Sequence, residues 1–438
     1  MKNFRKSFRN VFLYAAAAGM TATGAAAQEI PSTQTEVVQK LPGQSNDNQT
    51  ATSPTQRIAY PAPPKTAGAY EKYLKLPQCQ REIGAQFNNS KDVIRYMLNP
   101  HQTPDVKSPD MSEAQITKAQ RHLQDLGFKI ADDGQQGGQT TRAVMEFQML
   151  WGPISNTMEI TGVIDQNTMD HMEYYARMAQ RDSYAYDIPR AVVAAIRLTQ
   201  FRKGEDFEYL SDLFRQESTF RPEVTAHRGT ATGLGQHIER TIWKNYKYAG
   251  CNYGLEDYAK NIRITYTGDD KAEIGYAGSK REENFLLNLR KNPRFSALMT
   301  AENSQYEIGL IEHWTGMKLD QGWQKYSVHF MGVENGYFFW KGYKDSPNAK
   351  AAYAFPKSAR FNKSVFFNNR GRGSARSFQQ VTSWFDSKFG TGKYREQYRM
   401  AAYRPVKDDS GVRYAGKVEG NIEPTTQQVT PPPPKPQS

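Results

Sequence analysis

The stretch that decides the fold is FEYLSDLFRQESTFRPEVTAHRGTATGLGQHIERTIW, at residues 207–243. Apolar side chains recur in its first part at helical spacing, at Phe207, Leu210, Leu213 and Phe214. This spacing predicts a helix with one apolar face. Pro222 disfavours helical geometry in the residue before it, so the helix is expected to end just ahead of that proline.

One carboxyl group lies at the next turn of that apolar face. Glu217 is near the predicted C-terminal end of the helix, where desolvation and the helix dipole both raise the pKa of a carboxyl group. A general acid that works at neutral pH needs such a raised pKa. Asp212 falls on a different face and Glu223 lies past the helix end. Taken alone, the pattern also fits an ordinary surface glutamate at a helix end.

The sequence around this stretch is expected to be mainly α-helical. Residues 190–400 carry aromatic-rich helical patterns that Gly and Pro interrupt, and no series of alternating strand patterns recurs. A helical run is predicted at about 189–202, with Pro189 in its first turn. The length of 438 residues suggests two or three domains, because a single hydrophobic core stops growing well short of it.

The run E-S-x-F-x-P, followed by Ala and Gly, then G-L-G-Q and an aromatic residue, resembles the lytic transglycosylase branch of the lysozyme-like superfamily. The matching residues are Glu217, Ser218, Phe220, Pro222, Ala226, Gly229, Ala231, Gly233, Leu234, Gln236 and Trp243. Residues 291–303, 327–340 and 355–367 look like segments of one subset of that branch, which carries an HFLG motif. The resemblance covers about 190–390. It implies a lysozyme-like α-helical catalytic domain that cleaves the β-1,4 bond between N-acetylmuramic acid and N-acetylglucosamine.

The same resemblance implies roles for particular residues. Glu217 is the single catalytic carboxyl, which protonates the bridging oxygen and then deprotonates the muramoyl C6 hydroxyl, so that a 1,6-anhydro sugar forms. Substrate contacts are implied at Ser218, Gly233, Leu234 and Gln236. The A-Y-N-A-G segment of many relatives is absent, so the orienting tyrosine cannot be carried over. Tyr306 and Tyr326 are its candidates.

A second compact block is predicted at residues 111–175. Its helix and Gly-rich turn patterns are ITKAQRHLQDLGF (116–128), DGQQGGQTTRAVMEFQ (133–148) and TGVIDQNTMDHM (161–172). Thr140 and Thr168 are expected to cap the second and third helices. The block resembles the small three-helix peptidoglycan-binding domain of exported cell-wall enzymes, with Asp165 where that family often has Gly. This resemblance implies peptidoglycan glycan strands as the partner; the alternative is a spacer that binds nothing.

The first residues predict export. A basic start, MKNFRKSFRN, precedes the apolar stretch VFLYAAAAGM, and Ala25 and Ala27 are placed as in an A-x-A cleavage site. Residues 1–27 are therefore interpreted as a signal peptide cleaved after Ala27, and the mature protein as periplasmic or secreted, without a stable membrane anchor. Removing the four basic residues of this segment lowers the formal net charge from +12 to +8 (12 − 4). That balance favours an anionic partner, and export argues against nucleic acid.

The predicted order of the mature chain follows from composition. It comprises a disordered leader at 28–65, a helical connecting segment at 66–110, the wall-binding block at 111–175, the catalytic domain at 185–400 and a disordered Pro-rich tail at 405–438. A basic loop, NRGRGSAR (369–376), fits either contact with anionic groups or ordinary solvation.

Cysteine and histidine usage limits the chemistry. Cys79 and Cys251 are the only two cysteines, and export places both where disulfides persist, so we expect them to pair. Two separate buried thiols are the alternative. No metal site and no cofactor are expected, because the seven histidines are scattered and neither a phosphate-binding loop motif nor H-E-x-x-H is present.

Two classes of function remain open. One is an exported lytic transglycosylase that its binding module targets to the wall. The other is a non-catalytic wall-binding scaffold on a degenerate enzyme fold. Within the enzymes, a muramidase of the same fold, which hydrolyses the bond, is the runner-up. Envelope-assembly proteins are further candidate partners of either class.

Overall fold

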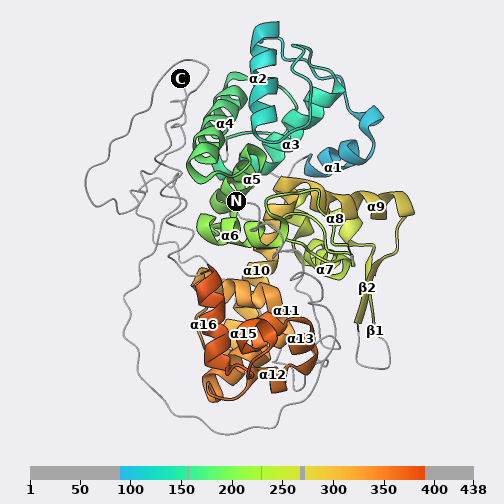
Figure 1. The fold of residues 1–438 in the computed structure, drawn as a ribbon. Coiled ribbons are helices and arrows are strands. Elements are labelled where there is room, and N and C mark those ends of the chain that lie inside the picture. The colour runs from blue at the N-terminus through green and yellow to red at the C-terminus, as the bar shows by residue number, and fades with distance from the viewer. Residues whose placement is uncertain (1–88, 156, 228, 267–271, 390–438) are drawn as a thin grey trace, which may run out of the picture.

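The computed structural model describes residues 89–389 except 156, 228 and 267–271, and this part of the chain is mainly α-helical (Figure 1). The helices are α1 (Ser90–Leu98), α2 (Glu113–Asp125), α3 (Gly138–Ser155), α4 (Gln166–Tyr186), α5 (Arg190–Lys203), α6 (Phe207–Ser218), α7 (Glu239–Ala249), α8 (Glu256–Ala259), α9 (Lys280–Asn288), α10 (Pro293–Thr315), α11 (Gly322–Asp345), α12 (Ala351–Ala354), α13 (Pro356–Phe361), α14 (Lys363–Phe366), α15 (Asn368–Gly371) and α16 (Phe378–Phe389). Short 3-10 helices are η2 (Pro100–Gln102), η3 (Gly250–Tyr253) and η4 (Leu289–Lys291). The expected mainly α fold is confirmed.

Several predicted segments lie outside the described residues. These are the signal peptide at 1–27, the leader at 28–65, the tail at 405–438, and the connecting segment up to residue 88, which includes Cys79. Cys251, at the start of η3, takes part in a disulfide. Its pairing with Cys79 stays a prediction, because the partner residue is not among those described.

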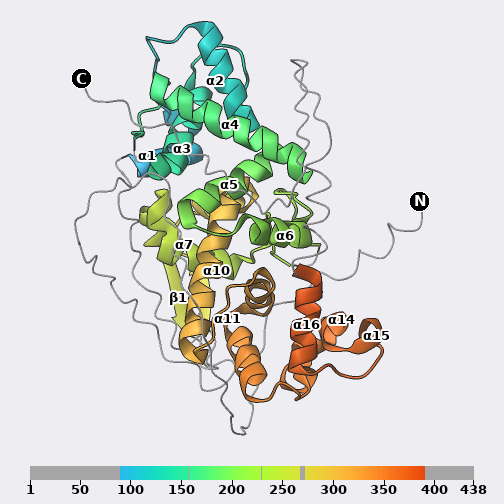
Figure 2. The same cartoon turned by 90° about the vertical axis from the view of Figure 1, so that its left-hand side faces the viewer.

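Helix α10 forms the centre of the molecule. It packs against α5 on one side and α11 on the other, and α11 in turn packs against α16. Helices α1–α4 lie at one end and α11–α16 at the opposite end (Figures 1 and 2). Buried apolar side chains form two cores: one joins α2–α4 to α7, and the other lies among α5, α6, α11 and α16. The first core therefore runs across the boundary predicted near residue 175.

One short β-hairpin interrupts the helical fold. Strands β1 (Ile262–Tyr266) and β2 (Ala272–Tyr276) pair antiparallel, with Ile262 opposite Tyr276 and Ile264 opposite Ile274. The Tyr276 ring stacks on Trp243 of α7 with centroids 5.4 Å apart, which fixes the hairpin to the helical body. This hairpin is a local exception in a region expected to be mostly α-helical.

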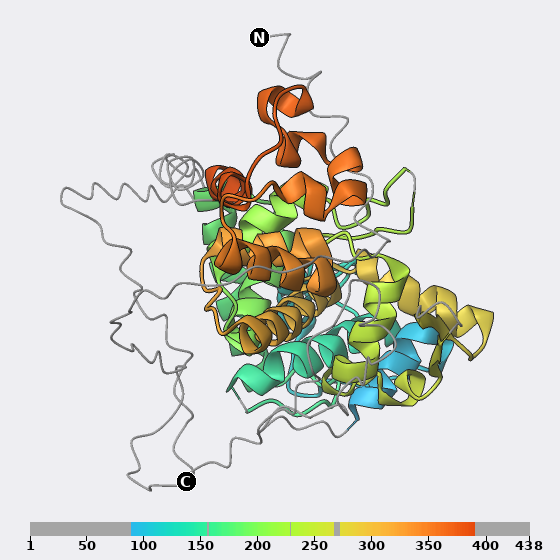
Figure 3. The ribbon, with the colours of Figure 1, turned by 90° about the horizontal axis from the view of Figure 1, so that it is seen from below.

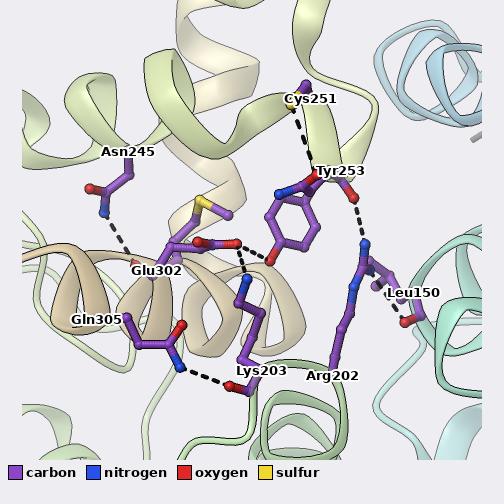
Figure 4. A network of polar contacts seen from close by, with 10 residues as sticks. Leu150, Arg202, Lys203, Asn245, Cys251, Tyr253, Glu302 and Gln305 are labelled. Carbon is purple, nitrogen blue, oxygen red and sulfur yellow. Dashed lines mark hydrogen bonds and ion pairs between the residues drawn. The ribbon is translucent and has the colours of Figure 1, made fainter. Parts of the chain in front are cut away.

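Polar contacts at the C-terminal end of α5 join this helix to α3, η3 and α10 (Figure 4). Arg202 donates to the carbonyl oxygens of Asn252 in η3 (2.6 Å) and Leu150 in α3 (3.4 Å). Its neighbour Lys203 forms an ion pair with Glu302 of α10 (2.8 Å), and Glu302 also accepts a hydrogen bond from the Tyr253 hydroxyl (2.7 Å). The block predicted at 111–175 is therefore in contact with the remainder of the described chain, through Leu150 and through the first core.

Candidate active site

Helix α6 forms as its sequence predicts. Asp206 caps its N-terminus, because the Asp206 carboxylate accepts a hydrogen bond from the Glu208 N–H (2.7 Å). The predicted apolar face, Phe207, Leu210, Leu213 and Phe214, is buried in the second core. The helix ends at Ser218, and Thr219 and Phe220 follow with φ of 53° and 58°. Two successive left-handed residues thus turn the chain directly after Ser218, the neighbour of Glu217.

Glu217 lies in a nearly enclosed position at the end of this helix. Only 11% of its side chain is exposed. The Tyr326 hydroxyl donates a hydrogen bond to Glu217 Oε1 (3.1 Å), and His329 Nε2 lies 4.0 Å from the same oxygen. Burial raises the pKa of Glu217 to about 7, and the hydrogen bond from Tyr326 acts in the opposite direction. The carboxyl group can therefore give up and take back a proton near neutral pH.

Tyr326 is held in place by aromatic packing. It lies in the first turns of α11, and its ring stacks on that of Phe389, at the end of α16, with centroids 3.7 Å apart. Burial keeps the pKa of Tyr326 well above its ordinary value, so the phenol stays protonated and acts as the hydrogen-bond donor. Tyr306 lies elsewhere: its ring stacks on Tyr248 with centroids 4.8 Å apart. Of the two candidate tyrosines, Tyr326 is the one that contacts Glu217.

Two neighbouring histidines, His329 and His237, extend the site beyond Glu217. His329 follows Tyr326 by one helical turn, and its ring meets that of His237 edge to face, with centroids 5.6 Å apart. His237 Nε2 lies 3.0 Å from Thr300 Oγ1, whose hydroxyl donates to the Ser296 carbonyl (2.8 Å), so His237 carries its proton on Nε2. Burial lowers the pKa of both histidines, and both rings are therefore neutral at pH 7. Sequence reasoning missed His329, although it belongs to the HFMG stretch within 327–340.

The glycine-rich turn after α6 is a closely packed support for this site. Gly233 has a φ of 88°, and a Cβ there would collide with the Arg290 carbonyl oxygen. The adjacent Leu234 N–H donates to Ser296 Oγ (3.0 Å). Gln236 donates its side-chain amide to the carbonyls of Val224 (3.1 Å) and Gly233 (2.8 Å). These bonds fix the turn against η4 and the start of α10.

Three residues with expected substrate roles make contacts inside the protein, and those substrate roles stay predictions. Ser218 is buried and donates its hydroxyl to the Phe214 carbonyl one turn back (2.9 Å). The Leu234 side chain is completely buried in the second core. The Gln236 amide protons are directed to the backbone of its own turn. These contacts help to hold the backbone around Glu217 in place.

The block at the other end of the molecule is built on two buried glutamines. Gln120 of α2 accepts from the Gly134 N–H (2.9 Å) and donates to Asp133 (2.9 Å). Gln148 of α3 accepts from the Gly162 N–H (2.8 Å) and donates to the Val163 carbonyl (3.0 Å). Each glutamine thus closes the glycine turn that follows its own helix.

The helix caps of this block differ from those expected. Thr140 lies inside α3 and accepts a hydrogen bond from Gln120 (3.0 Å). Asp165, the residue that departs from the family pattern, caps α4 by accepting from the Thr168 N–H (2.7 Å). The caps expected at Thr140 and Thr168 were therefore wrong, because each threonine lies inside its helix.

These features define a helical protein in which a small domain built on two glutamine-closed turns is packed against a helical unit with a buried carboxyl group. Residues 112–172 match the model of the family described as "Putative peptidoglycan binding domain". The chain thus contains a peptidoglycan-binding domain at 112–172, and this domain supports cell-wall binding, with peptidoglycan as its target.

Two further findings concern other kinds of site. Within residues 89–389, apart from the undescribed gaps, no three His, Cys, Asp or Glu side chains are grouped as a metal site would require. Over the same residues, no helix combines the length and the apolar character needed to cross a membrane.

Proposed function

We propose that this protein is an exported peptidoglycan lytic transglycosylase that acts in the periplasm or outside the cell. The observation that carries the proposal is the Glu217 carboxyl group, nearly enclosed at the end of α6, with a pKa of about 7 and a hydrogen bond from Tyr326. The peptidoglycan-binding domain at 112–172 supports targeting to the wall. The resemblance of residues 190–390 to lytic transglycosylases supplies the reaction.

The reaction needs one group that acts as an acid and then as a base. Protonated Glu217 gives its proton to the oxygen that links C1 of N-acetylmuramic acid to N-acetylglucosamine, and the C1–O bond breaks. The Glu217 carboxylate then takes the proton of the muramoyl C6 hydroxyl while that oxygen bonds to C1. Water is not consumed, and Glu217 ends protonated as it began. An intramolecular nucleophile gains from proximity, which contributes several kcal/mol or more.

The test is digestion of purified sacculi, with mass analysis of the soluble products. The wild-type protein should release muropeptides with anhydro ends, one water lighter than hydrolysed ones. Glu217→Gln keeps the shape of the side chain but removes the proton exchange, and it should abolish release while sacculus binding persists. Glu223→Gln is the matched control, because the Glu223 carboxylate is 61% exposed and pairs with Lys129 on the surface.

Each outcome separates the open alternatives. Reducing ends in the wild-type digest would indicate a muramidase on the same site. Intact sacculi with the wild-type protein would favour a wall-binding scaffold. Continued lysis by Glu217→Gln would contradict the assignment of this residue as the catalytic acid.

A further inference from the structure

The chain between α11 and α16 has an unusual charge. Residues 346–377 hold seven Lys and Arg residues and no Asp or Glu. We call residues 346–377, which include α12–α15, the basic lobe. Figures 2 and 3 show its short helices projecting beyond α16, at the end of the molecule opposite the peptidoglycan-binding domain. The catalytic proposal uses none of these residues.

The basic lobe is packed onto the second core. The Phe355 ring lies against those of Phe366 (centroids 6.3 Å apart) and of Phe378 at the start of α16 (6.2 Å). Arg376 donates to the carbonyls of Ser364 (2.7 Å) and Val365 (2.8 Å), so this one cation is used inside the lobe. These contacts hold the backbone of the lobe in place beneath its exposed side chains.

The outer surface carries unneutralised cations. Lys350, Lys357, Arg360, Lys363 and Arg372 are exposed, and none of them forms an ion pair within the described part of the chain. Gly371, with a φ of 91°, packs its backbone directly onto the Lys363 side chain. The turn 369–373 is thereby folded onto α14, which brings the stretches that carry Lys363 and Arg372 together.

Two large aromatic side chains lie on the same lobe and are also exposed. Tyr353 in α12 is 79% exposed and Phe361 at the end of α13 is 54% exposed. The Arg360 guanidinium lies 5.8 Å from the centre of the Phe361 ring. Exposed aromatic rings offer flat apolar faces, and such a face can pack on the C–H face of a sugar.

We infer that the basic lobe is a second peptidoglycan-binding surface, on which its cations bind stem-peptide carboxylates and Tyr353 and Phe361 pack on the sugar rings. Peptidoglycan combines carboxylates with sugar faces, and these complement the two kinds of exposed side chain found here. The inference rests on the proposed function for the choice of polymer. The domain at 112–172 binds the same polymer from the other end, so the two surfaces would act together.

The position of the basic lobe relative to Glu217 suits this role. Helix α16 starts at the lobe with Phe378 and ends with Phe389, whose ring stacks on Tyr326. Twelve residues of α-helix span about 18 Å. A strand held on the lobe would thus lie about one helix length from the catalytic carboxyl group.

The experiment measures binding of the full chain to insoluble sacculi by co-sedimentation, with Glu217→Gln as the starting protein so that no cutting occurs. The lobe variant adds Lys357→Gln, Arg360→Gln, Lys363→Gln and Arg372→Gln. Its control adds four neutralisations of exposed cations that change the net charge by the same amount, outside the lobe and outside 112–172: Lys260→Gln, Arg263→Gln, Lys280→Gln and Lys318→Gln. The lobe variant should bind about tenfold more weakly at low ionic strength, and the difference should shrink at high salt. The control should bind like its parent.

A second variant tests the aromatic contribution. Tyr353→Ser with Phe361→Ser should weaken sacculus binding about fivefold, and this loss should persist at high salt because it does not depend on charge. Unchanged circular dichroism and thermal midpoint show that each variant is folded. Equal binding by the lobe variant and its control would overturn the inference.

Two further measurements distinguish this inference from membrane binding and from a failure of the proposed function. Vesicles of phosphatidylglycerol and phosphatidylcholine in equal parts test a membrane instead. Loss of vesicle binding with intact sacculus binding would contradict the inference in favour of an anionic lipid surface. Lysis by the wild-type protein is measured separately, so a failure of the proposed function leaves the binding comparison readable.

Discussion

At the scale of the residue, Glu217 shows a conflict between function and stability. Its folded-state pKa of about 7 lies above the ordinary value of 4.5. Well below pH 4.5 the Glu217 carboxyl group is protonated in both the folded and the unfolded state, so it does not lower the free energy of unfolding. As pH rises from about 4.5 to about 7, the unfolded state ionises first, so the folded state loses roughly 3 kcal/mol relative to it.

This conflict predicts the stability of Glu217→Gln. The variant cannot ionise, and its side-chain carbonyl can still accept the hydrogen bond from Tyr326. We expect its free energy of unfolding, compared with wild type, to increase by up to about 3 kcal/mol between pH 4 and pH 8. Urea unfolding of both proteins at the two pH values measures this difference. A gain at pH 4 and none at pH 8 would show that the pKa of Glu217 is not raised by folding.

Tyr326 is expected to set the alkaline limit of activity. Its hydrogen bond favours the Glu217 carboxylate, so Tyr326→Phe should raise the pKa of that carboxyl group further. Because the acid form starts the reaction, the high-pH limb of kcat/KM should move to higher pH by about one unit. Tyr306→Phe is the control and should leave the limb in place. Movement to lower pH would contradict the donor role of Tyr326.

At the scale of the element, the end of α6 stores backbone strain beside the carboxyl group. Thr219 is exposed and has a φ of 53°, a conformation that a β-branched residue rarely adopts. Thr219→Gly should raise the free energy of unfolding by about 1 kcal/mol, because glycine takes this conformation without the Cβ clash. Thr219→Ala keeps the Cβ and should give no such gain. Thermal unfolding compares the three proteins, and equal gains for both variants would exclude strain as the cause.

The helices and strands also show which features of the structure could be predicted from the sequence. Helix α6 and its carboxyl group could be predicted because the apolar spacing and Pro222 lie within one short stretch. The hairpin β1–β2 was missed although Ile262 and Ile264 alternate with polar residues, since five residues are a weak signal against a long helical background. The pairing of Tyr326 with Glu217 depends on α11 packing against α6, and no local pattern carries that information.

At the scale of the whole molecule, one arginine joins the peptidoglycan-binding domain to the half that carries Glu217. Arg294, near the start of α10, donates to Glu146 of α3 (2.9 Å) and to the Leu126 carbonyl at the end of α2 (3.2 Å). Its guanidinium also lies 3.7 Å from the centre of the Phe128 ring. The side chains of Arg294 and Glu146 are 4% and 8% exposed. The binding domain is therefore fixed relative to Glu217 by a desolvated ion pair.

Breaking this pair should affect the entire molecule. Arg294→Met leaves the Glu146 carboxylate buried without its cation, which should lower the free energy of unfolding by about 3–5 kcal/mol. Adding Glu146→Leu removes the stranded charge and should recover most of that loss. The control is Lys129→Met, which breaks the exposed pair with Glu223 between the same two halves and should change stability little. Urea unfolding followed by tryptophan fluorescence measures all four proteins. If Arg294→Met unfolds like wild type, the two halves are held by their shared apolar core rather than by this ion pair.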